Sequence, residues 1–282
     1  STWVEDGSGA QIWRSPSGAA GTWSQVAQGG LGSTNNAEFM ALAVFNDHLY
    51  AGTWVGDTGV HGAEIWRSAT GDNGSWTRVA SNGFDNDPHN GAIISMKSFG
   101  GALYAATMNW ANGGEVWRTS NGVQWTQVNF NGFGNGANTH VSSLEVFDGR
   151  LYAGTRHSFG GGEIWRTANG TSWESVMLGG FGTPDNRQIA TLIHFRGELL
   201  AVAGNFVTGP EVWQSGSGEI GSWQKVLAGG FGAGYTALTA WDNHAAVYRG
   251  SLYIGTYTFG NSGGKLWKYL HNRIYLPKLD VE

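Results

Sequence analysis

A segment centred on tryptophan recurs at nearly regular intervals along the whole chain. In each copy an aliphatic residue precedes the tryptophan, and Arg, Lys or Gln follows it. The intervals between successive copies are 53, 51, 48, 48 and 54 residues, and the tryptophans are Trp13, Trp66, Trp117, Trp165, Trp213 and Trp267. A period near 50 residues is typical of β-propellers and of other proteins built from stacked supersecondary units. This repeat limits the fold before any other feature is considered.

Each repeat contains four short segments with the character of β-strands. In the copy around Trp165, the first two segments flank Asp148-Gly149, a dipeptide that favours a tight hairpin turn. The four segments of that copy are 141–147, 151–155, 163–167 and 173–176. Four short antiparallel strands per repeat describe one propeller blade. The 47 Gly and 15 Trp agree with an all-β chain of short strands and tight turns.

We therefore predict one all-β domain over residues 1–270, a β-propeller of four-stranded antiparallel blades. Strands one, two and four recur five times, but the third recurs six times, since the chain begins and ends in mid-blade. We expect five blades closed by the N- and C-terminal strands; the alternative is six blades with incomplete terminal ones. The repeats are expected at about 36–83, 84–132, 133–180, 181–230 and 231–270, the last completed by 1–35 through the strand around Trp23, with 271–282 as a tail or linker.

The extra third strand leaves the segments 11–14 and 265–268 competing for one place in the closing blade. One of them is displaced, the ring has six blades, or neighbouring molecules complete each other's blades. An unpaired strand edge is a template for pairing with another chain. The third alternative predicts a homo-oligomer formed by strand exchange at the chain ends.

Charge and hydropathy exclude several classes of partner. The formal net charge is −5 and the 16 Lys and Arg are scattered, so we expect no nucleic-acid partner. No apolar run approaches the ~18 residues of a membrane span. The absence of Cys and the scattering of the eight His predict no metal site, and we expect no cofactor. Few lysines with many Trp, Gly and Asn favour an extracellular, secreted protein, although the chain does not open with a signal segment.

The turn after the third strand resembles a known hairpin motif. Residues 119–125 and 167–173 each join Thr, Asn, Gly and Trp in an order similar to the Asp-box (BNR) hairpin, with Asn121 and Asn169 where that motif prefers Asp. Three other copies are two residues longer. Among five-bladed propellers, the tachylectin-type lectins are the most similar in general character. That resemblance implies one shallow sugar site per blade and an absence of catalysis.

Strand polarity predicts which end of the blades carries a binding site. Loops between strands two and three, and links from one blade to the next, share one end, and these segments vary most among the copies. Aromatic residues follow the second strand, where they can stack on sugar rings: Trp54, Trp110, Phe159, Phe206 and Tyr257. An asparagine also enters each inner strand: Asn36, Asn90, Asn138 and Asn186. We predict these nine residues as the ligand-binding set; the alternatives are that the rings wedge between blades and that the amides close turns.

Catalysis requires acidic residues that break the repeat. Glu64, Glu115, Glu163 and Glu211 repeat, and Arg67, Arg118 and Arg166 follow the first three at a spacing of three residues, so we expect structural ion pairs from blade to blade. Unrepeated acids include Asp85, Asp87, Asp185 and Asp242, and a sialidase-like site would need an arginine triad such as Arg156, Arg187 and Arg196. Near-identical blades favour multivalent binding over a single asymmetric site.

We therefore predict a non-catalytic lectin that binds glycans, and not an enzyme. The first alternative is an extracellular structural or adhesion subunit that assembles through its incomplete end blades. The second is a sialidase-like glycoside hydrolase.

Overall fold

The computed structural model describes residues 7–56, 59–205, 207–232, 245–256, 265–270 and 273–275. It divides into two compact units, Ser1–Val141 and Ser142–Glu282, which are described separately. Both units consist of antiparallel β-strands, and the tight turns that link successive sheets include the short helical segments η1 (Gly29–Leu31), η2 (Asn131–Gly134), α1 (Gly179–Gly182) and η3 (Gly230–Gly232). The predicted all-β chain of antiparallel propeller blades is confirmed.

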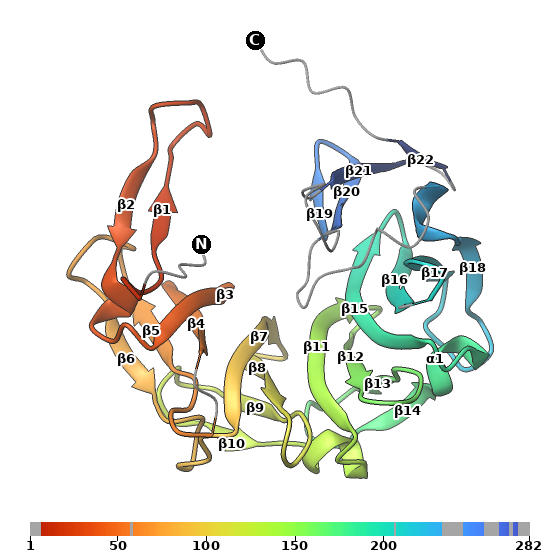
Figure 1. Cartoon of the computed structure of the whole chain (residues 1–282), viewed down its shortest axis with the longest axis horizontal. Helices are drawn as coiled ribbons and strands as arrows, with labels where there is room; N and C mark the ends of the chain where they lie inside the picture. Colours follow the sequence, from red (N-terminus) through yellow and green to blue (C-terminus); the bar gives the residue numbers. More distant parts are fainter. Residues whose placement is uncertain are drawn as a thin grey trace. The chain divides into compact units, whose positions relative to one another are not determined.

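Unit 1 begins with a two-stranded sheet and continues with two four-stranded blades (Figure 1). The small sheet pairs β1 (Ile12–Arg14) with β2 (Ser24–Ala27). The first full blade has β3 (Asn36–Phe45), β4 (His48–Val55), β5 (Ile65–Ser68) and β6 (Thr77–Ala80), and the second has β7 (Asn90–Phe99), β8 (Ala102–Asn109), β9 (Val116–Thr119) and β10 (Thr126–Gln127).

Strand β11 (Asn138–Phe147) crosses the boundary, and unit 2 continues the same pattern. Its strands are β12 (Arg150–His157), β13 (Ile164–Thr167) and β14 (Glu174–Met177), then β15 (Asn186–Phe195), β16 (Glu198–Asn205), β17 (Glu211–Ser215) and β18 (Gln224–Leu227), then β19 (Ala245–Tyr248), β20 (Ser251–Thr256), β21 (Lys265–Leu270) and β22 (Arg273–Tyr275). In the last two groups each strand pairs with the next one along the chain.

Two-residue turns join the first and second strands of the blades. Both residues of each turn have positive φ, as in Asn46-Asp47, with 46° and 56°, and Asp148-Gly149, with 46° and 68°. This is the type I′ geometry, whose twist matches that of the flanking strands. The turn predicted at Asp148-Gly149 is confirmed.

The chain ends pair differently from our expectation. Strand β22 lies within the segment that we assigned to a tail, and it pairs with β21 as the fourth strand of the C-terminal sheet. Strands β1 and β2, which we placed in the same closing blade, pair with each other in a separate sheet (red in Figure 1). The two copies of the third strand, β1 and β21, therefore each have a place of their own. No sheet closes on itself among the described strands, and the five-blade count and strand exchange stay predictions.

Aromatic rings fill the space between successive blades of the same unit. Phe84, in the link after β6, stacks on Trp117 of the next blade with ring centroids 4.5 Å apart and an interplanar angle of 9°. Phe181 and Trp213 repeat this contact in unit 2 at 4.3 Å and 5°. Beneath these rings lie aliphatic cores such as Ile164, Ile189 and Leu199, all fully buried. The recurring tryptophan therefore holds neighbouring blades together.

A glycine in the loop between β12 and β13 is required because the backbone of a link between blades comes close to it. A Cβ on Gly161 would overlap the backbone of Gly179 and Gly180, whereas a Cβ on Gly216 would meet no atom within 4 Å. Neither glycine has a positive φ, so a substitution at either tests space and not backbone strain. We expect Gly161→Ala to lower the free energy of unfolding by about 1–3 kcal/mol, as overpacking does. Gly216→Ala should change it by less than about 0.5 kcal/mol.

Urea denaturation of both variants measures the difference. Equal stability of the two variants would contradict this account of the link.

Candidate functional site

One end of the blades, which we call the loop end, carries the loops between the second and third strands and the links between blades. In unit 1 the backbone N–H of Gly59, in one such loop, donates to the carbonyl of Pro88 in the next link over 3.0 Å. Asn35 Nδ2 and His61 Nδ1 lie 3.2 Å apart across the same two kinds of segment. The prediction that these segments share one end is confirmed.

A short ladder at the loop end joins neighbouring blades at three places in the described chain. Trp54 pairs with Ala92 and Met108 with His140 in unit 1, and Arg156 pairs with Gln188 in unit 2. Each pair joins the end of a second strand to the start of the next inner strand. We call the inner-strand residues at this register the mouth positions. They are Ala92, His140 and Gln188, which belong to the ladders, and Glu38, which occupies the same place in the repeat; each lies two residues after the repeated asparagine. The repeat is broken at these positions, and we did not identify them from the sequence.

The four asparagines of the predicted binding set are buried and serve the scaffold. Asn90 Nδ2 donates to the Gly83 carbonyl over 2.8 Å and to Glu115 Oε2 over 2.6 Å. Trp117 Nε1 donates to the same carboxylate oxygen over 2.8 Å. The same three contacts recur at Asn36 and Asn186, and Asn138 Nδ2 donates to the Gly132 carbonyl over 3.0 Å. All four asparagines are at most 1% exposed, so they are not placed to contact a ligand.

The predicted aromatic set divides into packed and exposed rings. Trp54 is half-buried against Ala92, Ile94 and Met108, which agrees with the alternative that it wedges between blades. Trp110 is 45% exposed and meets the ring of the buried His140 edge-on, with centroids 4.7 Å apart. Phe159 is 86% exposed. Phe206 and Tyr257 lie outside the described residues.

The repeated glutamates pair with partners other than those we expected. Glu64 Oε1 lies 2.6 Å from Arg78 Nη1, and Glu211 Oε1 lies 3.1 Å from Lys225 Nζ. Arg166 instead contacts Glu174 and Glu219, at 2.7 Å each. We expected ion pairs from blade to blade. Arg166 does contact Glu219 of the next blade, but Glu64 and Glu211 pair with Arg78 and Lys225 of their own blades.

Asp87 is an ionised carboxylate at the loop end of unit 1. Its Oδ1 accepts from the backbone N–H of His89 and lies 2.9 Å from the His89 ring, while Oδ2 accepts from Asn109 and Asn112. Burial by itself would raise the pKa of Asp87, but these hydrogen bonds outweigh it and hold the pKa below its usual value. Asp87 therefore ties a link to the adjacent loop. Of the other unrepeated acids, Asp242 lies outside the described residues.

Glu38 is the acidic mouth position, and its carboxyl group has the opposite character. It lies on β3 opposite Trp54 and is half-buried. Burial raises the pKa of Glu38 above its ordinary value. In unit 1 burial thus raises the pKa of Glu38 and of Glu115, whereas hydrogen bonds lower the pKa of Asp87. Sites that need one protonated and one ionised acid contain carboxyl groups with pKa values displaced in opposite directions.

The arginine triad that we considered is not assembled. Arg156 and Arg187 lie at the loop end of β12 and β15, where Arg187 precedes the ladder residue Gln188. Arg196 lies in the turn at the opposite end of β15 and donates to the Gly250 carbonyl over 3.1 Å. Two of the three arginines are therefore neighbours and the third is not.

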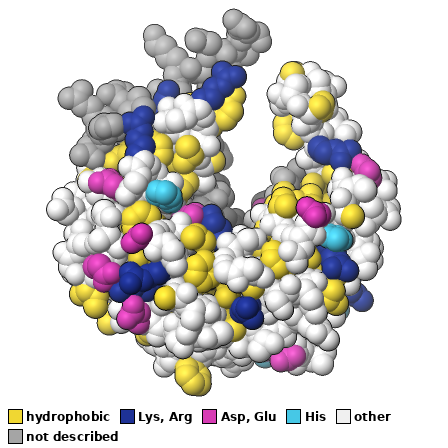
Figure 2. Space-filling view, turned by 180° about the vertical axis from the view of Figure 1, so that it is seen from behind, with side chains coloured by type: hydrophobic (Ala, Val, Ile, Leu, Met, Phe, Trp, Pro, Cys, Tyr) yellow, Lys and Arg dark blue, Asp and Glu magenta, His cyan; other side chains and the backbone are white. Residues whose placement is uncertain are grey.

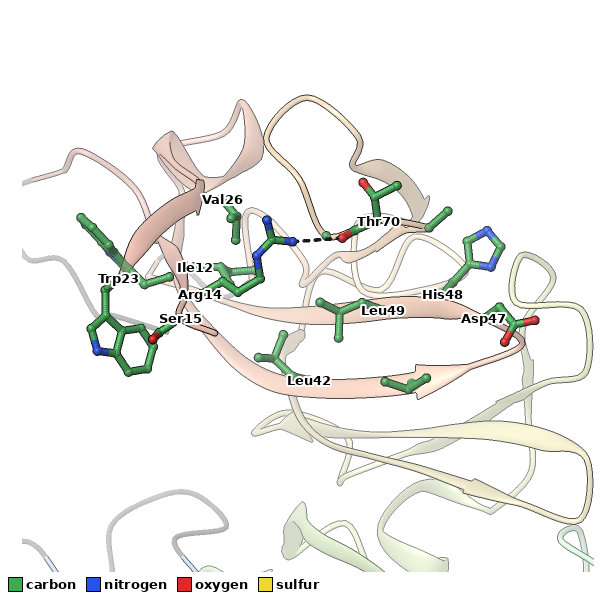
Figure 3. Close-up of a pocket in the computed structure, with 14 residues that line it drawn as sticks. Ile12, Arg14, Ser15, Trp23, Val26, Leu42, Asp47, His48, Leu49 and Thr70 are labelled. Carbon is green, nitrogen blue, oxygen red and sulfur yellow. Dashed lines mark hydrogen bonds between the residues drawn. The ribbon is translucent and has the colours of Figure 1, made fainter. Parts of the chain in front are cut away.

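A pocket of about 570 Å³ lies beside the β1–β2 hairpin (Figure 3). Trp23, Leu42 and Leu49 contribute apolar walls, and Arg14 Nη1 donates to the Thr70 carbonyl over 3.2 Å. Asp47 is the one carboxylate among its lining residues. This composition does not supply the two carboxyl groups of a glycosidase.

Metal sites, membrane-spanning helices and basic patches were also sought among the described residues. No three His, Asp or Glu side chains of the described residues gather as a metal site would. No helix in the described part of the chain has the length and apolar character needed to cross a bilayer. On the face in Figure 2, Lys and Arg lie scattered among Asp and Glu, without a basic patch for nucleic acid.

Comparison with known proteins gives similarity to solved structures only. No protein-family model matches the chain, and no curated protein matches it. An α-L-arabinofuranosidase from Clostridium thermocellum has 13% identity and a TM-score of 0.48, over 84% of this chain and 92% of that one. The Bacillus subtilis arabinanase has 15% identity and a TM-score of 0.47, over 81% of this chain and 92% of that one. The Bacillus licheniformis endo-arabinanase has 16% identity and a TM-score of 0.45, over 82% of this chain and 93% of that one.

These three structures are glycoside hydrolases, and they contradict two of our predictions. The sequence led us to expect a non-catalytic lectin, and therefore a protein that is not an enzyme. The similarity to these hydrolases contradicts both predictions. The blades are also not identical at the loop end, where the mouth positions differ from blade to blade.

The buried asparagine network predicts a large loss of stability on truncation. Asn186→Ala removes the amide group that donates to both the Gly180 carbonyl and the Glu211 carboxyl group. Each buried acceptor left without a donor lowers the free energy of unfolding by about 1–3 kcal/mol, and by more if it is charged. Gln224→Ala truncates an exposed amide of the same unit and should change stability by less than about 0.5 kcal/mol. Chemical denaturation of both variants measures the difference. Equal losses would show that the amide contributes nothing beyond a surface residue.

The lowered pKa of Asp87 predicts that its contribution to the free energy of unfolding depends on pH. Its pKa is lower in the folded state, so its contribution is present above the unfolded pKa and is lost as the pH falls through the folded pKa. We expect Asp87→Asn to be less stable than the wild type at neutral pH, with a difference that shrinks on acidification. Asn112→Ala, which removes one of the donors, should produce a smaller effect of the same sign. Denaturation curves across this pH range measure it, and a difference independent of pH would contradict the assignment.

Proposed function

We propose that this protein hydrolyses glycosidic bonds, with Glu38 as the proton donor at the loop end of unit 1. The observation that carries the proposal is the character of the mouth positions. Three of the four on the inner strands are Ala, His or Gln, and the fourth is a half-buried glutamate. Burial raises the pKa of that glutamate, which favours its protonated form. A glycosidase uses a carboxylic acid with a raised pKa to protonate the leaving oxygen.

The chemistry divides between two carboxyl groups. Glu38 gives its proton to the glycosidic oxygen as the bond to the sugar carbon breaks, and positive charge develops on the sugar. Water adds to that carbon, and the Glu38 carboxylate recovers a proton from it. We assign Asp87 to stabilising the positive charge and not to proton transfer, because both of its oxygens accept hydrogen bonds and its pKa is lowered.

Trp110 is the ring that we propose for sugar contact in unit 1. It is 45% exposed, and the buried His140 fixes it from one edge. A flat aromatic face stacks on the apolar face of a sugar ring. Of the nine residues of the predicted binding set, Trp110 and Phe159 keep this role in the proposal, since both rings are exposed.

We further propose that the turns after the third strands are hairpins of the Asp-box type. Asn121 Oδ1 accepts from the backbone N–H groups of Val123 and Gln124, and Thr119 Oγ1 accepts from that of Gly122. Asn169 and Thr167 make the corresponding bonds in unit 2. This hydrogen bonding supports the kinship and carries no statement about activity.

Two other expectations from the sequence stay proposals. An extracellular location rests on composition. A homo-oligomer formed at the chain ends rests on the β1–β2 sheet, which pairs with no further strand among the described residues.

Turnover of a panel of nitrophenyl pentosides and hexosides, in both anomeric forms, tests the function. We expect release of nitrophenol from at least one of them. Glu38→Gln should lower kcat by about 10²–10⁴-fold, the usual contribution of a general acid. Glu198→Gln, a glutamate at the opposite end of a blade, is the matched control and should keep the wild-type rate. A wild-type rate in Glu38→Gln, or no turnover on the whole panel, would sink the proposal.

The pH profile gives a second readout of the same residue. Activity requires protonated Glu38, so kcat should fall as the pH rises through the pKa of this group. Because burial raises that pKa, the fall should lie at higher pH than for an exposed glutamate.

A further inference from the structure

Two arginines lie together at the loop end of unit 2. Arg156, at the end of β12, is directly opposite Gln188 in the ladder between β12 and β15. Arg187 immediately precedes Gln188 on β15, and both arginines are half-buried. Gln188 is 1% exposed and its Nε2 donates to Ser142 Oγ over 3.2 Å. The backbone that carries the two arginines is therefore held in place by the sheet.

The surroundings of Arg156 disfavour its positive charge. Burial first, and then the charge of Arg187, lower the pKa of Arg156 to about 10. Two like charges that are partly removed from water repel each other more strongly than exposed ones. An anion bound between them would offset both effects and would receive charge-assisted hydrogen bonds from planar, rigid donors.

An exposed aromatic ring follows the arginine pair. The ring nitrogen Nδ1 of His157 accepts from the backbone N–H groups of Phe159, over 3.2 Å, and Gly160, over 2.7 Å. These bonds hold the loop close to the end of β12, next to Arg156. Phe159 itself is 86% exposed, which is unusual for a phenylalanine and leaves a flat apolar surface on the loop that follows Arg156.

We propose that Arg156 and Arg187 bind the carboxylate of an acidic sugar, whose ring stacks on Phe159. The arginine pair supplies recognition of the anion, and the aromatic ring supplies recognition of a sugar as opposed to an inorganic anion. The ligand class is a uronic-acid saccharide. This site lies within unit 2 and does not depend on the proposed hydrolysis at Glu38, so binding tests it without any measurement of turnover.

Isothermal titration of the full chain with a galacturonic-acid oligosaccharide tests the proposal. The matched comparison is the neutral galactose oligosaccharide of the same length, and inorganic sulfate is the anion without a sugar. We expect the acidic oligosaccharide to bind at least 10-fold more tightly than either. Arg156→Gln and Arg187→Gln should each weaken it at least 10-fold, whereas Arg196→Gln, at the other end of β15, should bind as the wild type does.

Phe159→Ala separates the two parts of the site. It should weaken binding of the acidic oligosaccharide and leave any weak binding of sulfate unchanged. The arginine variants should unfold at the same or a higher temperature than the wild type, because each relieves the repulsion between two like charges; this control excludes misfolding as the cause of lost binding.

Three results would overturn the proposal. They are no binding of the acidic oligosaccharide, equal binding of the neutral one, and unchanged binding by Arg156→Gln and Arg187→Gln. Sulfate that binds as tightly as the acidic oligosaccharide would also overturn it, since the site would then recognise an anion alone. None of these results bears on turnover by Glu38.

Discussion

A buried hydrogen-bonded triplet of Asn, Glu and Trp underlies the repeated architecture. In the blade of Asn90, one amide group donates both to the carbonyl of Gly83 and to the carboxylate of Glu115, which also accepts from Trp117. The triplet therefore fixes the link between blades, the start of the inner strand and the start of the third strand at once. A buried carboxylate is tolerated only with such partners. The same requirement in the blades of Asn36, Asn90 and Asn186 explains why these residue types repeat.

Because the triplet residues are needed for structure, the residues proposed for function lie at neighbouring positions outside the triplet. Two residues after each asparagine, the chain reaches a mouth position, where the side chain is free to differ between blades. Glu38 occupies one such position in unit 1, and Gln188 occupies another in unit 2 beside Arg187. The proposed proton donor and the proposed carboxylate site are thus both variations on one register position. A rigid scaffold with variable ends of strands is a common basis for function on repeated folds.

Much of the fold could be predicted from the sequence, because the spacing of tryptophans and the Asp148-Gly149 turn are local signals. The pairing of the chain ends could not, because Arg273–Tyr275 has no counterpart in the repeat and its role as β22 depends on the edge of β21. The asparagines were identified correctly as a repeated feature but given a binding role. Their repetition itself argued for a structural one, since a buried network must be satisfied in every blade.

The candidate site was harder to predict, because its signal is the breaking of a pattern at a single residue. Glu38 has no motif around it, and burial, which sets its pKa, depends on the packing of neighbouring strands. A ¹³C NMR titration of the side-chain carboxyl groups, with Glu38→Gln to assign the signal, tests the central claim most directly. The account predicts that Glu38 titrates above the ordinary range of a glutamate. A pKa of Glu38 at or below its ordinary value would contradict it.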